Sequence, residues 1–153
     1  PIMQQHRDKI APEIVGNIER GLNITPPQIF EAERIRIELF KKILDFFETH
    51  DFLICPAASI APFPVDQRYV TEIDGKPCET YIDWFSITFA LTMTACPTIS
   101  VPCGFTSEGL PVGVQIMGKP RGEAALLLVA KRFEQAIGIS AKLPIAPQKL
   151  KLI

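Results

Sequence analysis

The stretch from Pro97 to Gly118, PTISVPCGFTSEGLPVGVQIMG, limits the possible fold more than any other part of this 153-residue chain. Residues 98–105 and 111–118 are two runs rich in apolar and β-branched side chains, and the TSEG between them is a turn signal. A connection this short joins antiparallel neighbours. The sequence therefore predicts an antiparallel strand pair with a tight turn.

Two helices are predicted before this strand pair. Residues 11–23 show a short helical pattern, which Gly21 is expected to end. Residues 25–50 form the clearest helical pattern, because apolar side chains recur there at intervals of three and four. Thr25 and Gln28 have the spacing of a capping box, which marks the start of that helix.

Two further segments are predicted to be helical. Residues 81–95 are rich in Thr and aromatic residues, which favours a strand, but their apolar spacing and length favour a buried helix that Pro97 ends. Residues 122–138 form an amphipathic helix with Glu123 in its first turn and Gly138 as its stop.

The region between residues 51 and 81 is predicted to be mostly extended or irregular. The apolar run 52–55 fits a buried strand that Pro56 ends. A proline-rich connection over 60–67 follows, and residues 68–81 form a small hairpin or an irregular flap around Asp74-Gly75. Helices and strands mixed in this way predict an α/β fold.

Composition leaves two explanations open for the high apolar content. Apolar residues make up 47% of the chain and charged residues 22%, and the mean hydropathy is +0.18. A free-standing domain of this size is usually more polar. Either the α/β core is unusually well buried, or this segment packs against more protein. A chain that begins with Pro1 rather than Met favours the second explanation.

Charge and cysteine content argue against several classes of partner. A net charge of −1 gives no electrostatic footprint for nucleic acid or for an anionic membrane. No apolar run is long enough to span a bilayer. The four cysteines have no metal-binding spacing and no secretory signal precedes them, so we expect reduced, buried thiols in a cytoplasmic protein without metal or other cofactor.

No complete catalytic set is recognisable, so no catalytic residue is predicted. The serine-hydrolase motif GxSxG and the glycine-rich phosphate loops are missing. His50 lies at the end of a predicted helix, where a cation is favoured, and His6 lies near the start of the chain. Cys103 before Gly104 could act as a nucleophile, but no base is apparent beside it.

The strand pair and the following helix nevertheless resemble a known family. Pro97, the run Ser100 to Gly104, the run Gly109 to Gly113, Gln115 and Glu123 match a pattern in the C-terminal region of the amidase signature family. The likeness covers about residues 14–138.

Segments further upstream also match this family pattern. Asp51, Leu53 and Pro56 resemble the Asp–hydrophobic–Leu–x–x–Pro strand of the family. The chain departs from the family where an Asn-Leu-x-Gly stretch is common, because Thr92 and Ala95 occupy those positions.

This resemblance implies a fold and an activity. Residues 1–153 would be the C-terminal fragment of one larger amidase-type domain, in which they complete a mixed β-sheet flanked by helices. An irregular tail is expected over 139–153. The family hydrolyses carboxamide C–N bonds with a Ser-Ser-Lys set from its N-terminal and middle parts, without a cofactor. Nothing in this chain matches that set, so the chain alone is predicted to be inactive.

The resemblance also implies that this chain lines part of a substrate pocket. The candidate wall positions are Pro56, Ala57, Tyr81, Trp84, Thr92 and Cys96. The expected partners are the remainder of the amidase chain and a small amide substrate, and self-association into a homo-oligomer stays open. The alternative is a stand-alone, non-catalytic module of the same fold that binds a partner or a small ligand.

Overall fold

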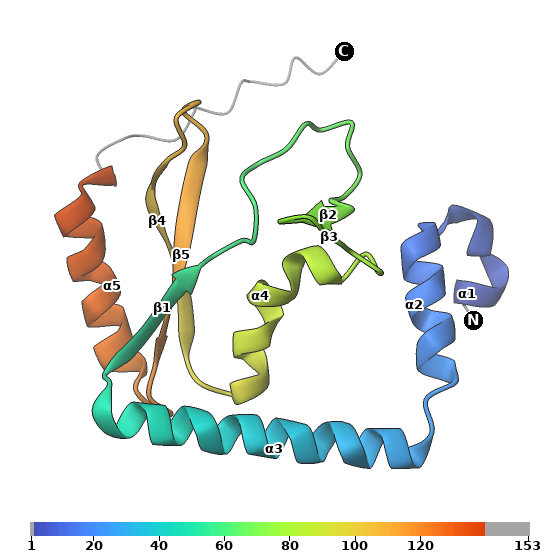
Figure 1. The fold of residues 1–153 in the computed structure, drawn as a ribbon, viewed down its shortest axis with the longest axis horizontal. Coiled ribbons are helices and arrows are strands. Elements are labelled where there is room, and N and C mark those ends of the chain that lie inside the picture. The colour runs from blue at the N-terminus through green and yellow to red at the C-terminus, as the bar shows by residue number, and fades with distance from the viewer. Residues whose placement is uncertain (1, 140–153) are drawn as a thin grey trace.

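A computed structural model describes residues 2–139 of the chain (Figure 1). The tail expected over 139–153 lies, from residue 140 on, outside the described residues. The helices are α1 Ile2–Gln5, α2 Pro12–Leu22, α3 Pro26–Thr49, α4 Ser86–Ala90 and α5 Glu123–Ile137, with short 3₁₀ helices at Arg7–Lys9, Asp83–Phe85 and Leu91–Thr94. The strands are β1 Phe52–Pro56, β2 Glu72–Ile73, β3 Lys76–Pro77, β4 Thr98–Phe105 and β5 Pro111–Gly118.

The predicted strand pair is the centre of the fold. β5 lies between β1 and β4 in a three-stranded sheet, and both pairings are antiparallel. In the turn between β4 and β5, the Thr106 N–H donates to the Leu110 carbonyl at 2.8 Å. Gly109 has a φ of +83°, a conformation that glycine adopts without a Cβ clash. The mixed α/β class and this hairpin are confirmed.

The core has two sides because β5 is covered on both faces. Ile116 and Met117 are both 0% exposed, and adjacent residues of a strand point to opposite faces. Ile116 packs with Val101 and with α5 through Leu126 and Ala130. Met117 packs on the other side with Phe47 at the end of α3 and with Cys96. The sheet is therefore held between α5 and the last turns of α3.

The long helix α3 begins as predicted and is buried only near its end. The Thr25 N–H donates to Gln28 Oε1 at 2.8 Å, in a capping box that satisfies an otherwise free donor. Phe47 is the one buried residue of the helix, whereas Phe30 is 75% exposed. Most of α3 therefore packs against nothing within the described part of the chain.

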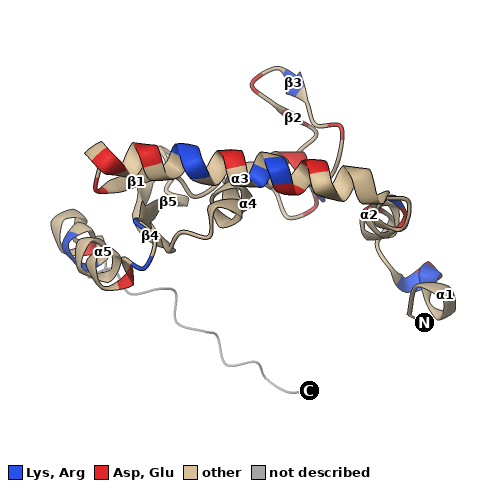
Figure 2. Cartoon of the chain, turned by 90° about the horizontal axis from the view of Figure 1, so that it is seen from below, with Lys and Arg blue, Asp and Glu red and all other residues tan. Residues whose placement is uncertain are grey.

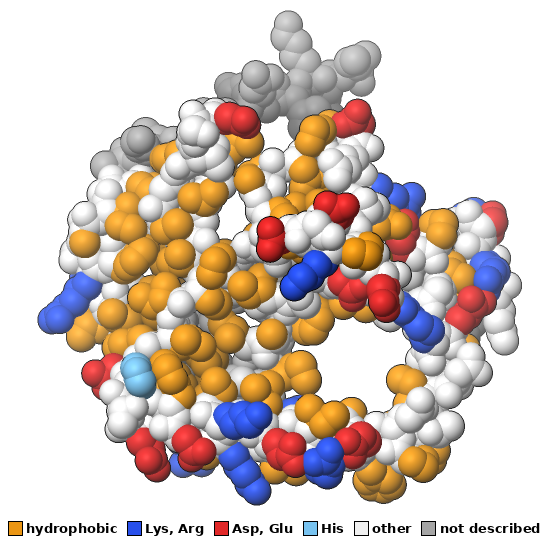
Figure 3. All heavy atoms as spheres, in the orientation of Figure 1, with side chains coloured by type: hydrophobic (Ala, Val, Ile, Leu, Met, Phe, Trp, Pro, Cys, Tyr) orange, Lys and Arg blue, Asp and Glu red, His pale blue; other side chains and the backbone are white. Residues whose placement is uncertain are grey.

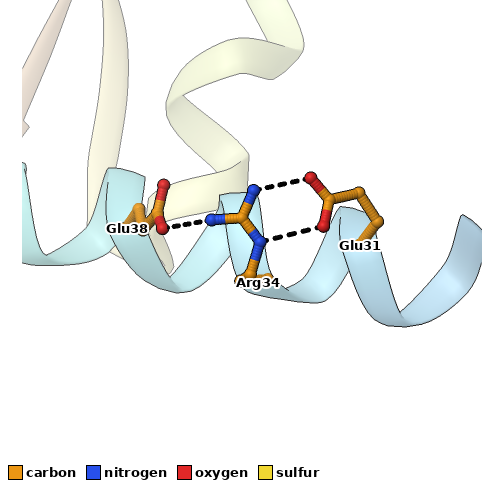
Figure 4. Close-up of polar contacts among 3 residues, drawn as sticks. All are labelled: Glu31, Arg34 and Glu38. Carbon is orange, nitrogen blue, oxygen red and sulfur yellow. Dashed lines mark hydrogen bonds and ion pairs between the residues drawn. The ribbon is translucent and has the colours of Figure 1, made fainter.

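Acidic and basic residues alternate along α3 (Figure 2). Arg34 pairs with Glu31 one turn before it and with Glu38 one turn after it (Figure 4). These contacts hold the pKa of the Glu31 carboxyl below its usual range and raise that of the Arg34 guanidinium. Exposed pairs of this kind add little to stability, so the triad serves mainly to solvate one face of the helix.

Of the two possibilities left open for residues 68–81, the structure shows a small hairpin around Asp74-Gly75. Glu72 pairs with Pro77, and Ile73 pairs with Lys76. Asp74 and Gly75 have φ values of +50° and +72°, and two successive positive φ angles are the mark of a type I′ hairpin turn.

Three expectations about local structure need correction. The 81–95 segment is helical but divided into a 3₁₀ turn, α4 and a second 3₁₀ turn, and Ala95 with a φ of +55° ends it before Pro97. Gly21 does not end α2, which continues to Leu22. The strand at 52–55 is present, but it lies at an edge of the sheet, where α5 packs mainly on β4 and β5, and Ile54 is 53% exposed.

The expectation of buried cysteines is correct only for Cys96. All four thiols are free, but Cys55, Cys78 and Cys103 are half-exposed. Cys96 is held against Phe47 and Met117 in the core, so its role is that of a small apolar side chain.

The molecule is much more open than a finished domain of its size. Its accessible surface is 12054 Å², whereas a compact protein of this mass exposes about 7,700 Å². Fifteen residues of fully extended chain expose about 2,400 Å², so the residues outside the described range cannot account for the excess. Figure 3 shows an opening between α2 and α3, with both hydrophobic and charged side chains around it. Such an opening contrasts with the close packing of protein interiors.

Candidate functional site

A concave, largely apolar hollow lies beside the β4–β5 hairpin. It has a volume of about 540 Å³ and is lined by residues 56–63, Trp84, Cys103 and residues 111–114. The loop that follows β1 forms one wall, the start of β5 forms another, and Trp84 contributes from the 3₁₀ turn before α4.

The first wall is attached closely to β5 at a glycine. The Ala57 N–H donates to the Gly113 carbonyl at 3.0 Å. A Cβ atom built on Gly113 would lie 3.1 Å from the Val101 carbonyl oxygen and 3.5 Å from the Ala57 Cβ. Only glycine lets the loop and β4 approach β5 this closely without displacement, so a side chain at this position would push β4 or the loop away from β5.

Gln115 ties the same loop to the segment that carries α4. Its side-chain amide donates to the Pro56 carbonyl at 3.1 Å and to the Ile87 carbonyl at 3.3 Å. Gln115 is only 6% exposed, and a buried amide of this kind costs stability unless its donors are used. Two neighbouring walls of the hollow are therefore held in place by one side chain.

A bulge in β4 brings Cys103 to the hollow. Pro102 pairs with Gly113 and Gly104 pairs with Val112, so Cys103 is the extra residue between the two pairs. A bulge of this kind redirects a side chain and bends the strand. Cys103 lines the hollow, but the described lining contains no histidine or carboxylate that could act as its base.

Trp84 is the aromatic anchor of the site. Its ring makes edge-to-face contacts with Phe63 at 5.6 Å and with Phe85 at 5.3 Å, measured between ring centroids. The Trp84 Nε1 atom is buried, and it has no acceptor among the described residues. A buried indole N–H usually finds an acceptor, so this donor has an unmet hydrogen bond within the described part of the chain.

The electrostatics of the hollow are close to neutral. No acidic or basic side chain belongs to its described lining. Burial raises the pKa of the nearby Cys55 thiol, which favours the uncharged form. Asp83, the residue before Trp84, has a lowered carboxyl pKa. The cause is that the hydroxyl and the N–H of Thr80 both donate to this carboxylate at 2.8 Å. This pair starts the 3₁₀ turn that carries Trp84.

The structure brings together three of the six predicted wall residues. Pro56, Ala57 and Trp84 line the hollow. Tyr81 contributes instead to a separate, shallower depression beside α2. Thr92 is exposed on the 3₁₀ turn after α4, and Cys96 lies in the core. A pocket role for these six residues stays a prediction.

Gly113, Gln115 and Cys103 belong to the candidate site, although the sequence did not mark them as wall residues. Gln115 carried a signal, because it is a polar residue within an otherwise apolar strand.

The described residues contain no set of three or more His, Cys, Asp or Glu side chains placed to hold a metal ion. The ring of His50 stacks against Phe46 at 4.2 Å between centroids. Its Nδ1 atom lies 3.1 Å from the Phe46 carbonyl oxygen, at the end of α3 as predicted. Across residues 2–139, no helix has both the length and the apolar content needed to cross a membrane.

The three-stranded sheet therefore has helices on both of its faces and a hollow between the loop after β1 and the start of β5. A family model described as Amidase matches residues 3–127. The chain therefore belongs to the amidase signature family, and it corresponds to a partial, C-terminal segment of its members.

Individual relatives agree with this assignment. A glutamyl-tRNA(Gln) amidotransferase subunit of Prochlorococcus marinus (strain MIT 9211) is 32% identical over 114 residues, which are 74% of this chain and 22% of that protein. An acylamidase of Rhodococcus erythropolis is 32% identical over 132 residues, which are 86% of this chain and 28% of that protein. This chain also aligns with the crystal structure of a bacterial aryl acylamidase of the amidase signature family, with a TM-score of 0.78 at 24% identity. The alignment covers 94% of this chain and 31% of the acylamidase chain. The chain thus spans less than a third of the length of these relatives.

Proposed function

We propose that this chain is the C-terminal segment of an amidase that hydrolyses a carboxamide C–N bond. The catalytic Ser-Ser-Lys set would lie in a preceding part of the complete protein. This segment would complete the sheet of the enzyme and form one side of its substrate pocket, and by itself it would be inactive. We place the enzyme in the cytoplasm, in keeping with its four free thiols.

The match of residues 3–127 to the amidase family supports the activity, and the observation that supports a missing preceding part is the uncovered apolar surface around β1. Ile54 is exposed on β1, and Leu128 on the neighbouring helix α5 is 52% exposed. β1 has a free edge among the described strands, and such an edge is normally paired or covered. A further strand and helix from a preceding part of an amidase would cover both.

The exposed apolar side chains of α2 and α3 support the same conclusion. Leu22 is 78% exposed, and Ile29, Ile35 and Ile37 of α3 are each about half-exposed. Monomeric proteins rarely leave apolar surface of this extent uncovered. The remainder of the amidase chain is the proposed cover, and a second copy of the whole enzyme could bury what remains.

The experiment compares two proteins under the same conditions. The complete open reading frame and residues 1–153 alone are each produced and assayed for release of ammonia or amine from a panel of carboxamides. We expect hydrolysis by the complete protein only, and the Cys103→Ser variant of that protein should still hydrolyse these amides. Hydrolysis by residues 1–153 alone, abolished in Cys103→Ser, would replace the proposal with a cysteine hydrolase.

The same experiment addresses a non-catalytic binding module. In that case the complete protein would hydrolyse no amide, and its reading frame would contain no upstream Ser-rich segment with a preceding Lys.

A further inference from the structure

We infer that the hollow beside the β4–β5 hairpin receives an uncharged, apolar substituent of the amide substrate, an aromatic ring or a branched alkyl group. The inference rests on the proposed function, because it names the substrate class of the same site. It concerns what the substrate carries next to the amide, not the amide bond itself.

The chemistry of the walls is the first argument. The fourteen lining residues include no acid and no base, and their polar side-chain groups are the Ser59 hydroxyl, the Cys103 thiol and the Trp84 indole. A charged group moved into such surroundings loses its water and gains no counter-charge, which is costly. An apolar group is favoured there because it leaves water for an apolar surface.

The size and stiffness of the hollow are the second argument. A volume of about 540 Å³ lies in the range of about 300–1,000 Å³ that is typical of small-molecule sites. Gln115 fixes two of its walls by hydrogen bonds, and the close approach at Gly113 fixes the loop against β5. A preformed concave site of this kind suits a small ligand, whereas the exposed apolar side chains of α3 lie on a convex helix surface that suits a polypeptide.

Trp84 supplies the third argument. Its edge-to-face contact with Phe63 places two aromatic rings in one wall, and aromatic rings pack well against a further ring. Its buried N–H has no acceptor among the described residues. A substituent with one acceptor oxygen would satisfy this donor, and a purely hydrocarbon substituent would not.

The test uses the complete enzyme and three matched amides. Their substituent is a phenyl ring, a phenyl ring with a carboxylate, or a phenyl ring with an aminomethyl group. We expect kcat/KM to be at least about tenfold higher for the uncharged ring than for either charged analogue.

Ala58→Glu and a matched control then locate this preference in the hollow. Ala58 lines the hollow and is itself exposed, so a longer acidic side chain can be added there without filling the core. We expect Ala58→Glu to lower kcat/KM for the uncharged ring by about tenfold or more. The ratio of kcat/KM for the aminomethyl analogue to kcat/KM for the uncharged ring should rise. Lys42→Glu, which also adds a carboxylate but lies on the exposed, charged side of α3, should alter neither value.

The outcomes separate failure of the assignment of the hollow from failure of the proposed amidase function. If the enzyme hydrolyses amides but treats charged and uncharged rings alike, or if Ala58→Glu leaves the preference unchanged, the assignment of the hollow is wrong and the proposed function stands. If Ala58→Glu lowers the melting temperature and reduces all three rates equally, the hollow is filled by polypeptide, which also overturns the assignment. If the complete protein hydrolyses no amide at all, the proposed function itself fails.

A second variant decides the matter if Ala58→Glu does not fold. Trp84→Phe keeps an aromatic ring but removes the free N–H donor. We expect the preference for an acetyl-substituted ring over its hydrocarbon isostere to fall about three- to tenfold, with little change for the hydrocarbon itself. An identical preference in both proteins would overturn the assignment.

Discussion

Replacing Gln115 by Met tests whether one buried amide holds the pocket wall. Met keeps nearly the same volume but cannot donate a hydrogen bond, so the carbonyls of Pro56 and Ile87 lose their donor at 3.1 and 3.3 Å. Leaving buried acceptors unmet costs about 1–3 kcal/mol. Because both contacts are only part-buried, we expect the free energy of unfolding of the complete protein to fall by about 2 kcal/mol.

The assay is urea unfolding of the complete protein, followed by kinetics with its best amide substrate. Gln135→Met is the matched control, because Gln135 is exposed on α5 and exposed substitutions usually change stability by less than about 0.5 kcal/mol. Gln115→Met should also raise KM, since the loop after β1 is no longer tied to α4. A free energy of unfolding that matches the control within about 0.5 kcal/mol would refute the reasoning.

Three further predictions concern single positions. Gly113→Ala places a Cβ 3.1 Å from the Val101 carbonyl oxygen, and we expect a loss of about 1–3 kcal/mol in urea unfolding together with a lower kcat/KM; unchanged values would contradict the close approach. Met117→Ala leaves a cavity at a position that is 0% exposed, so the free energy of unfolding should fall by about 2–5 kcal/mol. A fall of less than about 1 kcal/mol would be inconsistent with that burial. Asp83→Asn removes a carboxylate whose pKa is lowered by Thr80; the melting temperature of the variant should be lower above about pH 4, and the difference should vanish as acid protonates Asp83. A difference that grows on acidification would show the sign to be wrong.

Local patterns in the sequence were sufficient for most of the secondary structure. The β4–β5 hairpin, α5 with its stop at Gly138 and α3 with its cap at Thr25 all depend on neighbouring residues. Such elements are predicted well because turn residues, caps and apolar periodicity act over short distances. The division of the 81–95 segment was not predictable in this way, since Ala95 adopts a left-handed conformation that its sequence does not announce.

Burial was predicted less well than secondary structure. The apolar run 52–55 indicates a buried strand, yet Ile54 is exposed at a sheet edge. An apolar pattern reports the surroundings that a strand has in the complete protein, and a chain that spans less than a third of its relatives contains only some of those surroundings.

The candidate site was only partly predictable for a related reason. Pro56 and Ala57 end or follow a predicted strand, and Trp84 lies in the aromatic-rich segment 81–95, so each had a local signal. Cys103 reaches the hollow only because β4 has a bulge. Gln115 matters because two distant carbonyls converge on it. Contacts of this kind depend on the tertiary fold.

The measurement that tests the account most directly is the fluorescence of a hydrophobic dye bound to residues 1–153 produced alone, compared mole for mole with the complete protein. If this segment is one part of a larger amidase domain, its uncovered apolar surface should make the isolated chain bind the dye strongly and associate, while the complete protein binds little. A monomeric isolated chain that binds no more dye than the complete protein would contradict the account.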